Sequence, residues 1–221
     1  MNSDNFFISW FDYVTTRTDM VQAGLITHIT YVVTVIFSAT IFALTLAILT
    51  RKNPFLKELS LAITSVFLTI PSLALFTIFI PIVGLGFTPS FIALFLYSLL
   101  PIFRNTITGL ESIDPDVIES ARGMGYTKRQ ILFKIELPLA WPVVLAGIRT
   151  AAMLIIGIAA IATLVAGRGL GDFIKDGLSR LPLPNSLEAI WTGVILSILL
   201  AIVIDSFLRF IKRTTISKGI L

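Results

Sequence analysis

The residues from Ile29 to Leu49 include no charged side chain, and four other apolar stretches follow along the chain. A helix of about 20 such residues matches the hydrocarbon thickness of a lipid bilayer. The other stretches are residues 59–83, 90–103 with an extension to 110, 141–166 and 189–210. The sequence therefore predicts an all-α fold, a polytopic membrane bundle of five transmembrane helices. Pro71 lies within the second stretch and is expected to face protein, where neighbouring groups can satisfy the carbonyl it frees.

The composition supports a membrane protein. Hydrophobic residues make up 56% of the 221 residues and charged residues 14%, whereas a soluble domain has about 45–50% and about 25%. Lipid is therefore expected to cover part of the surface. The chain has no Cys and one His, so no metal site is expected within one chain. That single His28, near the outer end of the first span, is expected to be structural.

Lysine and arginine are divided unequally between the two sides of the predicted spans. One side has four, namely Arg17, Arg168, Lys175 and Arg180. The other side has twelve, namely Arg51, Lys52, Lys57, Arg104, Arg122, Lys128, Arg129, Lys134, Arg209, Lys212, Arg213 and Lys218. Because basic residues favour the cytoplasmic side, we expect the N-terminus outside and the C-terminus in the cytoplasm. Residues 1–221 would form one transmembrane domain, with extracytoplasmic segments at 1–22 and 167–187 and a cytoplasmic loop at 111–138.

That cytoplasmic loop contains the longest polar segment, from Asp114 to Pro138. Asp114-Pro115 is typical of a helix N-cap followed by Pro at the first helical position. The residues 123–125, Gly-Met-Gly, interrupt the helix, and residues 127–130, Thr-Lys-Arg-Gln, restart it as a capping box. Pro138 marks a second stop or kink. The segment predicts two short helices joined at a glycine elbow.

From the residues alone, this elbow has two possible roles. Its apolar side chains recur at helical spacing and could enter a groove of a partner protein: Val117, Ile118, Ala121 and Met124. An amphipathic loop lying on the membrane would show the same pattern. Two short helices with a glycine turn also resemble a helix-turn-helix DNA reader, but the position between two membrane spans argues against nucleic acid as a partner.

The spacing of particular residues in the loop resembles a known family. Glu119-Ser120-Ala121, Gly125, Ile135 and Leu137-Pro138 match the cytoplasmic "EAA" loop of permease subunits of bacterial ABC importers. Ser120 replaces the first Ala, a change of one small residue for another. The wider run of residues 109–151, with ARGMG and LAGIRTA, resembles the importers of osmoprotectants such as glycine betaine, carnitine and choline.

This resemblance implies a type I importer permease fold in the bacterial cytoplasmic membrane. It implies two ATPase subunits docked on the loop, a second permease chain, identical or homologous, and an extracytoplasmic substrate-binding protein. ATP and Mg²⁺ would bind the ATPase subunits, and no cofactor would bind this chain, whose glycines lack the order of a phosphate-binding loop. One alternative is a methionine or other amino-acid importer permease. Another is a secondary carrier working alone, which would need intramembrane carboxylates.

Two charged residues lie at depth within predicted spans, Arg149 and Asp205. Charges inside a membrane usually face the bundle interior and pair, so one hypothesis is that these two form an ion pair. The alternative is that Arg149 extends to the interface and Asp205 lies in it.

The translocation path is expected to be lined by polar and aromatic positions, which could attract a quaternary ammonium through cation–π contacts. The candidates are Thr69, Ser72, Tyr97, Ser98, Asn105 and Thr163; the alternative for each is ordinary packing. Within the outer segment, residues 172–179 could form a short helix that caps the path, or an ordinary connecting loop.

Overall fold

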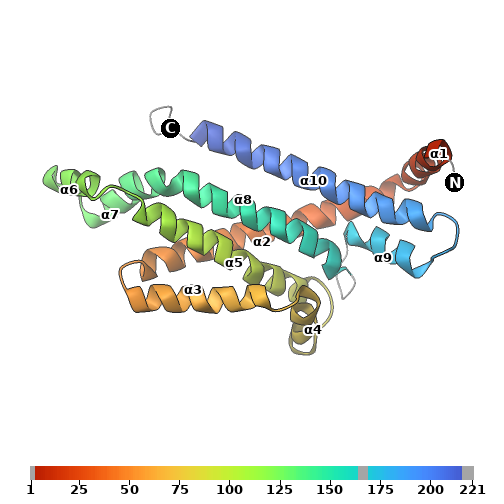
Figure 1. Cartoon of the computed structure of the whole chain (residues 1–221), viewed down its shortest axis with the longest axis horizontal. Coiled ribbons are helices and arrows are strands. Elements are labelled where there is room, and N and C mark those ends of the chain that lie inside the picture. The colour runs from red at the N-terminus through yellow and green to blue at the C-terminus, as the bar shows by residue number, and fades with distance from the viewer. Residues whose placement is uncertain (1–2, 164–168, 216–221) are drawn as a thin grey trace.

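The computed structural model describes residues 3–163 and 169–215, and within them the apolar stretches are helical apart from a break at residues 70–71. The axes of the long helices are roughly aligned, and α6 and α7 lie at one end of the bundle while α1 and α9 lie at the other (Figure 1). The helices in chain order are α1 (Ser3–Thr15), α2 (Thr18–Thr50), α3 (Pro54–Thr69), α4 (Ser72–Val83), α5 (Phe87–Glu111), α6 (Pro115–Gly123), α7 (Lys128–Ile131), the π-helical turn η1 (Leu132–Glu136), α8 (Leu137–Ala162), α9 (Gly171–Ser179) and α10 (Ser186–Thr215).

Four helical segments of the described residues are long and apolar enough to cross a membrane: α2, α5, the continuous segment from α7 to α8, and α10. The bent pair of α3 and α4 supplies a fifth span if it is counted as one. α2 begins 11 residues before the predicted span, at Thr18. Its 33 residues extend over about 50 Å at 1.5 Å per residue, so its outer part projects beyond a hydrocarbon layer of about 30 Å.

The second predicted span, residues 59–83, is not one straight helix. The axes of α3 and α4 differ by 99°. Pro71 causes the break because it has no N–H to donate and because it disfavours a helical conformation at Ile70, whose ψ is 130°. The hydroxyl of Tyr97 donates to the carbonyl of Ile70, which the break would otherwise leave unpaired. Pro71 itself is exposed on this chain, so the prediction that it faces protein was wrong for the chain alone.

Helices α5 and α8 form the centre of the bundle, and α2 packs across them. Gly147 of α8 lies against α5 so closely that a Cβ atom there would stand 2.6 Å from the Pro101 carbonyl oxygen and 2.7 Å from the Asn105 Cβ. From α2, a strip of fully buried alanines faces the same core: Ala39, Ala43 and Ala47. Small residues of this kind allow close helix packing in membranes. In contrast, only 6% of the most apolar stretch of α10 is buried within this chain.

The sequence predicted a stop or a kink at Pro138, and the helix that begins at Lys128 does not stop there. It continues through η1 into α8 and ends at Ala162, 35 residues in all. In η1 the N–H of Leu137 bonds to the carbonyl of Leu132, five residues back. This longer spacing changes the hydrogen-bond register just before Pro138, which has no N–H to contribute. The segments α7, η1 and α8 are therefore joined without an intervening loop.

We predict that Gly147→Ala will lower the thermal unfolding temperature of the purified chain in detergent, because the new methyl group would force α5 and α8 apart. Overpacking of this kind typically costs about 1–3 kcal/mol. The matched control is Gly157→Ala in the same helix, where a Cβ atom would meet nothing within 4 Å and helix propensity would improve. Equal unfolding temperatures for the two variants would contradict the close contact.

Candidate functional site

The elbow between α6 and α7 is built by local signals, as the sequence predicted. The Asp114 side chain accepts a hydrogen bond from the N–H of Asp116 at 2.9 Å, which caps the start of α6. At the other end of α6, Gly125 has a φ of +83°, a conformation that favours glycine. The Thr127 N–H donates to the Gln130 side chain at 2.8 Å, and the Gln130 N–H donates to the Thr127 hydroxyl at 3.3 Å. These reciprocal bonds are the predicted capping box.

Two further backbone hydrogen bonds close the end of α6. The N–H of Tyr126 donates to the Ala121 carbonyl at 3.1 Å, and the N–H of Gly125 donates to the Arg122 carbonyl at 2.9 Å. Together with the positive φ of Gly125, this pair forms a Schellman motif, which satisfies carbonyls that a helix end leaves free. The elbow is thus fully hydrogen-bonded at its turn and has a defined shape before any partner binds.

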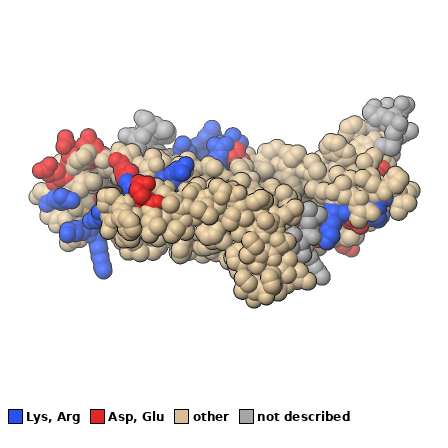
Figure 2. Space-filling view, turned by 60° about the horizontal axis from the view of Figure 1, so that its bottom comes forward, with Lys and Arg blue, Asp and Glu red and all other residues tan. Residues whose placement is uncertain are grey.

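The elbow presents both apolar and charged side chains at one end of the bundle. Val117 is 41% exposed and Met124 is 69% exposed, and Glu119 and Ser120 are also exposed. A shallow hollow of about 650 Å³ lies beside α6 and is lined by Ile113, Pro115, Ile118, Glu119, Arg122 and Gly123. Figure 2 shows acidic and basic side chains together at this end, next to a wide surface that is nearly free of charge.

Ala121 differs from its neighbours in the motif because it is buried, with 1% of its surface exposed. It therefore packs within this chain. The helical spacing had predicted that Ala121 forms part of the exposed apolar face, and this prediction was wrong. Among the later motif residues, Ile135 and Leu137 are half-buried and Pro138 is exposed. They lie in η1 and at the start of α8, so the motif extends from the elbow into a membrane-spanning helix.

A buried ion pair that the sequence did not predict joins α2 to the foot of α8. An Nη atom of Arg51 lies 2.6 Å from Oε2 of Glu136, and the two side chains are only 14% and 10% exposed. Glu136 lies in η1, next to the elbow, and Arg51 follows the last residue of α2. The two residues are 85 positions apart in the chain, so local patterns could not predict the pair. Arg51 was counted only among the basic residues of the predicted cytoplasmic side.

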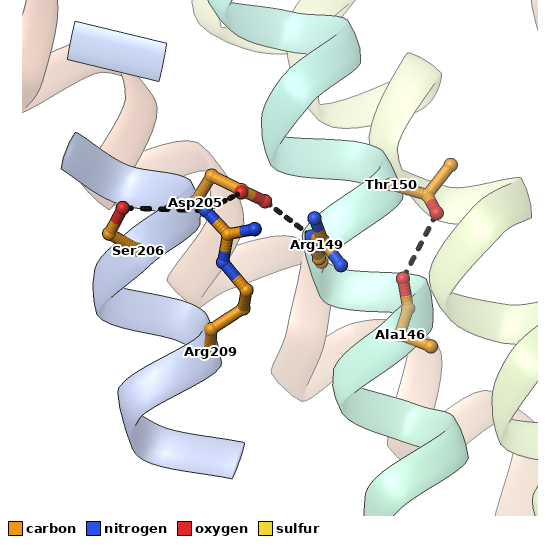
Figure 3. A network of polar contacts seen from close by, with 6 residues as sticks. All are labelled: Ala146, Arg149, Thr150, Asp205, Ser206 and Arg209. Atoms are coloured by element: carbon orange, nitrogen blue, oxygen red, sulfur yellow. Dashed lines mark hydrogen bonds and ion pairs between the residues drawn. The ribbon is translucent and has the colours of Figure 1, made fainter. Parts of the chain in front are cut away.

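Arg149 and Asp205 lie together between α8 and α10 (Figure 3). The Nε–H of Arg149 donates to one oxygen of the Asp205 carboxylate, and Arg209 approaches the other oxygen at 2.7 Å. The sequence suggested the first partner but not the second. One carboxylate is thus shared by two guanidinium groups on neighbouring helices.

Three of the six residues proposed to line a path are buried, and each donates to a backbone carbonyl of this chain. Tyr97 bonds to Ile70, as described above, while Ser98 donates to Leu94 at 2.8 Å and Thr163 to Ala160 at 2.9 Å. In this conformation these three side chains serve packing and backbone hydrogen bonding, and their place along a path stays a prediction. Thr69 is exposed, and Ser72 and Asn105 are half-buried.

The end of the bundle opposite the elbow includes a short helix, α9, at the place where residues 172–179 were expected to form one. Residues 164–168 before it lie outside the described part of the chain. A cavity of about 570 Å³ between α2 and α9 is lined by Met20, Ala23, Gly24, Thr27, Gly169, Asp172, Phe173, Lys175, Asp176 and Ser179. His28, just below, is 1% exposed and its Nε2 lies 3.1 Å from the Ile156 carbonyl oxygen, which is a structural role. Within residues 3–163 and 169–215, no three His, Asp or Glu side chains come together as metal ligands would.

Removing one member of the Arg51–Glu136 pair should destabilise the protein more than removing both. Glu136→Gln leaves a buried guanidinium without its counter-charge, which typically costs about 3–5 kcal/mol, whereas Arg51→Met with Glu136→Leu leaves no charge behind. Thermal unfolding of the purified chain would rank the variants. Lys57→Met is the control, because its partner Glu111 is 50% exposed and exposed pairs contribute little. A double variant that is less stable than Glu136→Gln would contradict this account.

A charge exchange tests the pair in Figure 3. We expect Asp205→Asn to reduce the amount of folded protein in the membrane, because two arginines then lack their shared carboxylate. Exchanging the residues, Arg149→Asp with Asp205→Arg, should restore part of that amount; the rescue would be partial because the new arginine would face Arg209. No rescue at all, measured as folded protein by size-exclusion chromatography in detergent, would show that the contact between α8 and α10 does not depend on this pair.

Comparison with known proteins identifies the family of the chain. Residues 39–217 match the model of the binding-protein-dependent transport system inner membrane component. The glycine betaine/carnitine/choline transport system permease protein OpuCD of Bacillus subtilis (strain 168) is 40% identical over 179 residues, which cover 81% of this chain and 76% of that protein. The carnitine transport permease protein OpuCD of Listeria monocytogenes serotype 1/2a (strain 10403S) is 38% identical over 180 residues, which cover 81% and 79%.

Solved structures share the fold at lower identity. The MetNI methionine ABC transporter in an inward-facing conformation has a chain with a TM-score of 0.75 and 24% identity, covering 90% of this chain and 97% of that chain. An amino acid ABC transporter crystallised with histidines also gives a TM-score of 0.75, at 17% identity, covering 92% and 98%. Together with the family match and the relatives, the five-span bundle and its hydrogen-bonded elbow lead to one conclusion: the chain belongs to the family of binding-protein-dependent transport system inner membrane components, the permease subunits of ABC importers.

Proposed function

We propose that this chain is the membrane-spanning subunit of an ATP-driven importer of a quaternary ammonium compatible solute such as glycine betaine, carnitine or choline. The observation that carries the solute class is the 38–40% identity, over four fifths of the chain, to permeases named for those solutes. The structural neighbours from amino-acid transporters are 24% and 17% identical and support the fold alone. A methionine importer is therefore the weaker candidate.

The elbow is the proposed docking site for an ATPase subunit, two of which would serve a pair of permease chains. Exposed apolar side chains on a short helix fit a groove on a partner, and Val117 and Met124 supply them. Glu119 adds a charge beside the hollow along α6. ATP and Mg²⁺ would bind those partners, and this chain would take no part in hydrolysis.

Movement of the elbow would reach the spans by two routes. The first is the uninterrupted helix from Lys128 to Ala162, which contains the central span α8. The second is the Arg51–Glu136 pair, which connects η1 to the end of α2. ATP binding would supply the free-energy difference between two arrangements of these helices, and each arrangement would open the path to one side.

A second permease chain would complete the path, because five spans enclose little space. The exposed side of α8 around Gly157 is one surface that could receive it. Thr69, Ser72 and Asn105 remain candidate path residues because none of the three is fully buried. A substrate-binding protein would deliver the solute at the outer end near α9. In this proposal the N-terminus would lie outside and the elbow and the C-terminus would lie in the cytoplasm, as the distribution of lysine and arginine predicts.

A secondary carrier working alone is disfavoured by the state of the intramembrane carboxylates. A coupled carrier needs a carboxylate that exchanges a proton or a cation, but Glu136 pairs with Arg51 and Asp205 with two arginines. These groups are occupied as ion-pair partners in this conformation.

Uptake by proteoliposomes tests the proposal directly. The permease is reconstituted with its ATPase and binding protein, and ATP-dependent uptake of labelled glycine betaine is measured against unlabelled betaine, carnitine, choline and methionine. We expect competition by one or more of the quaternary ammonium solutes and none by methionine. Competition by methionine alone would support the amino-acid importer, and uptake by the permease without its ATPase would contradict the proposal.

Gly125→Ala provides the arm of this experiment that addresses coupling. The φ of +83° at Gly125 would strain a residue with a Cβ atom by about 1–2 kcal/mol, so the variant should lower ATP-dependent uptake severalfold. Gly123→Ala is the control: a Cβ atom meets nothing within 4 Å at either glycine, and only Gly125 has a positive φ. Equal uptake by both variants would show that the shape of the elbow does not matter for coupling.

A further inference from the structure

The charged residues that line one pocket between α8 and α10 are all basic. Its volume is about 370 Å³, and its lining consists of Leu145, Ala146, Arg149, Thr150, Met153, Leu208, Arg209 and Lys212. Asp205 compensates part of the charge, since it pairs with both Arg149 and Arg209. Lys212 forms no ion pair within the described residues. Three cations thus face one carboxylate, and the pocket has an excess of about two positive charges.

The depth of these cations is set by contacts at the end of α10. The indole N–H of Trp141 donates to the Thr215 hydroxyl at 3.1 Å, and Trp residues favour the interface between membrane and water. Lys212 and Arg209 precede Thr215 by three and six residues, which is about 4.5 and 9 Å along a helix. The cations therefore begin just below the interface on the side with most of the basic residues.

The rest of the pocket is apolar. Leu145, Met153 and Leu208 form its other walls, and Met153 lies 12 residues beyond Trp141, about 18 Å deeper along α8. Only 6% of the most apolar stretch of α10 is buried by the rest of this chain. The site thus combines a basic mouth at the level of lipid headgroups with an apolar wall that continues toward the membrane centre.

We propose that this pocket binds an anionic phospholipid of the cytoplasmic leaflet, with its phosphate at Arg209 and Lys212 and an acyl chain along the apolar wall. Uncompensated cations are costly in a low-dielectric environment, and basic pockets between spans on the cytoplasmic side suit anionic headgroups. A soluble anion would satisfy the charge but leave the apolar wall uncovered. This binding site does not depend on which solute is transported.

Fluorescence quenching of Trp141 tests the site. The full chain, with Trp10→Phe and Trp191→Phe so that Trp141 is the only Trp, is placed in nanodiscs with brominated phosphatidylglycerol or brominated phosphatidylcholine. We expect half-maximal quenching at a several-fold lower mole fraction of the anionic lipid. Lys212→Gln should weaken that preference about fivefold, equivalent to about 1 kcal/mol per basic residue near the surface. Arg213→Gln is the matched control, because Arg213 is adjacent but does not line the pocket.

Four outcomes would overturn the proposal. The first two are equal quenching by the two lipids and an equal effect of Arg213→Gln and Lys212→Gln. The third is relief of quenching by inorganic phosphate, which would indicate a site for a soluble anion. The fourth is quenching by neither lipid, as expected if a second copy of the chain covers the pocket. Native mass spectrometry of the chain with all its Trp residues provides a second measurement that needs no Trp replacement. Retained phosphatidylglycerol that is lost in Lys212→Gln but kept in Arg213→Gln would support the site, and no retained lipid would reject it.

Discussion

A bilayer offers no water to the peptide backbone, so each carbonyl freed by a proline must find its partner within the protein. This requirement explains how the chain tolerates prolines in or near its spans. At Pro71 the helix breaks, and the hydroxyl of Tyr97 donates a hydrogen bond to the carbonyl of Ile70. At Pro138 the helix continues, and a π-helical turn absorbs the change of register. The same constraint therefore produces a sharp bend at one place and an unbroken helix at the other.

The paired charges follow a related rule. Arg51 pairs with Glu136, and Asp205 pairs with Arg149 and Arg209, and each group connects two helices in the half of the bundle that ends in the elbow. A charge in this environment is costly unless it is paired, so the helices that carry the partners are constrained to move together. Each group has a member in or next to α8: Glu136 directly precedes this helix, and Arg149 lies within it. The central span is thus linked to α2 on one side and to α10 on the other.

The sequence predicted best those features that depend on residues close together in the chain. The N-cap at Asp114, the interruption of the helix at residues 123–125 and the capping box from Thr127 to Gln130 all depend on side chains within three residues of the groups they bond or on the backbone freedom of glycine. The apolar stretches predicted the positions of the membrane-spanning helices, because length and hydrophobicity determine whether a segment can cross a bilayer.

Features that depend on distant partners could not be predicted in this way. The bend at Pro71 is stabilised by a residue on another helix, 27 positions away, and Arg51 is separated from Glu136 by 85 positions. The hydrogen bonds of Tyr97, Ser98 and Thr163 to backbone carbonyls could not be predicted either, because the polarity of a side chain does not reveal which group packing places beside it. Burial of Ala121 likewise depends on how the elbow folds back on its own chain.

The hydrogen-bonded turn at the end of α6 affects how tightly a partner can bind. A segment that is disordered before binding must give up conformational freedom on association, and this loss reduces the free energy left for other work. The Schellman motif and the capping box already hold the elbow in one shape. An engaging partner would therefore lose little affinity to ordering this segment, and more of its binding free energy would remain to displace the helix that begins there.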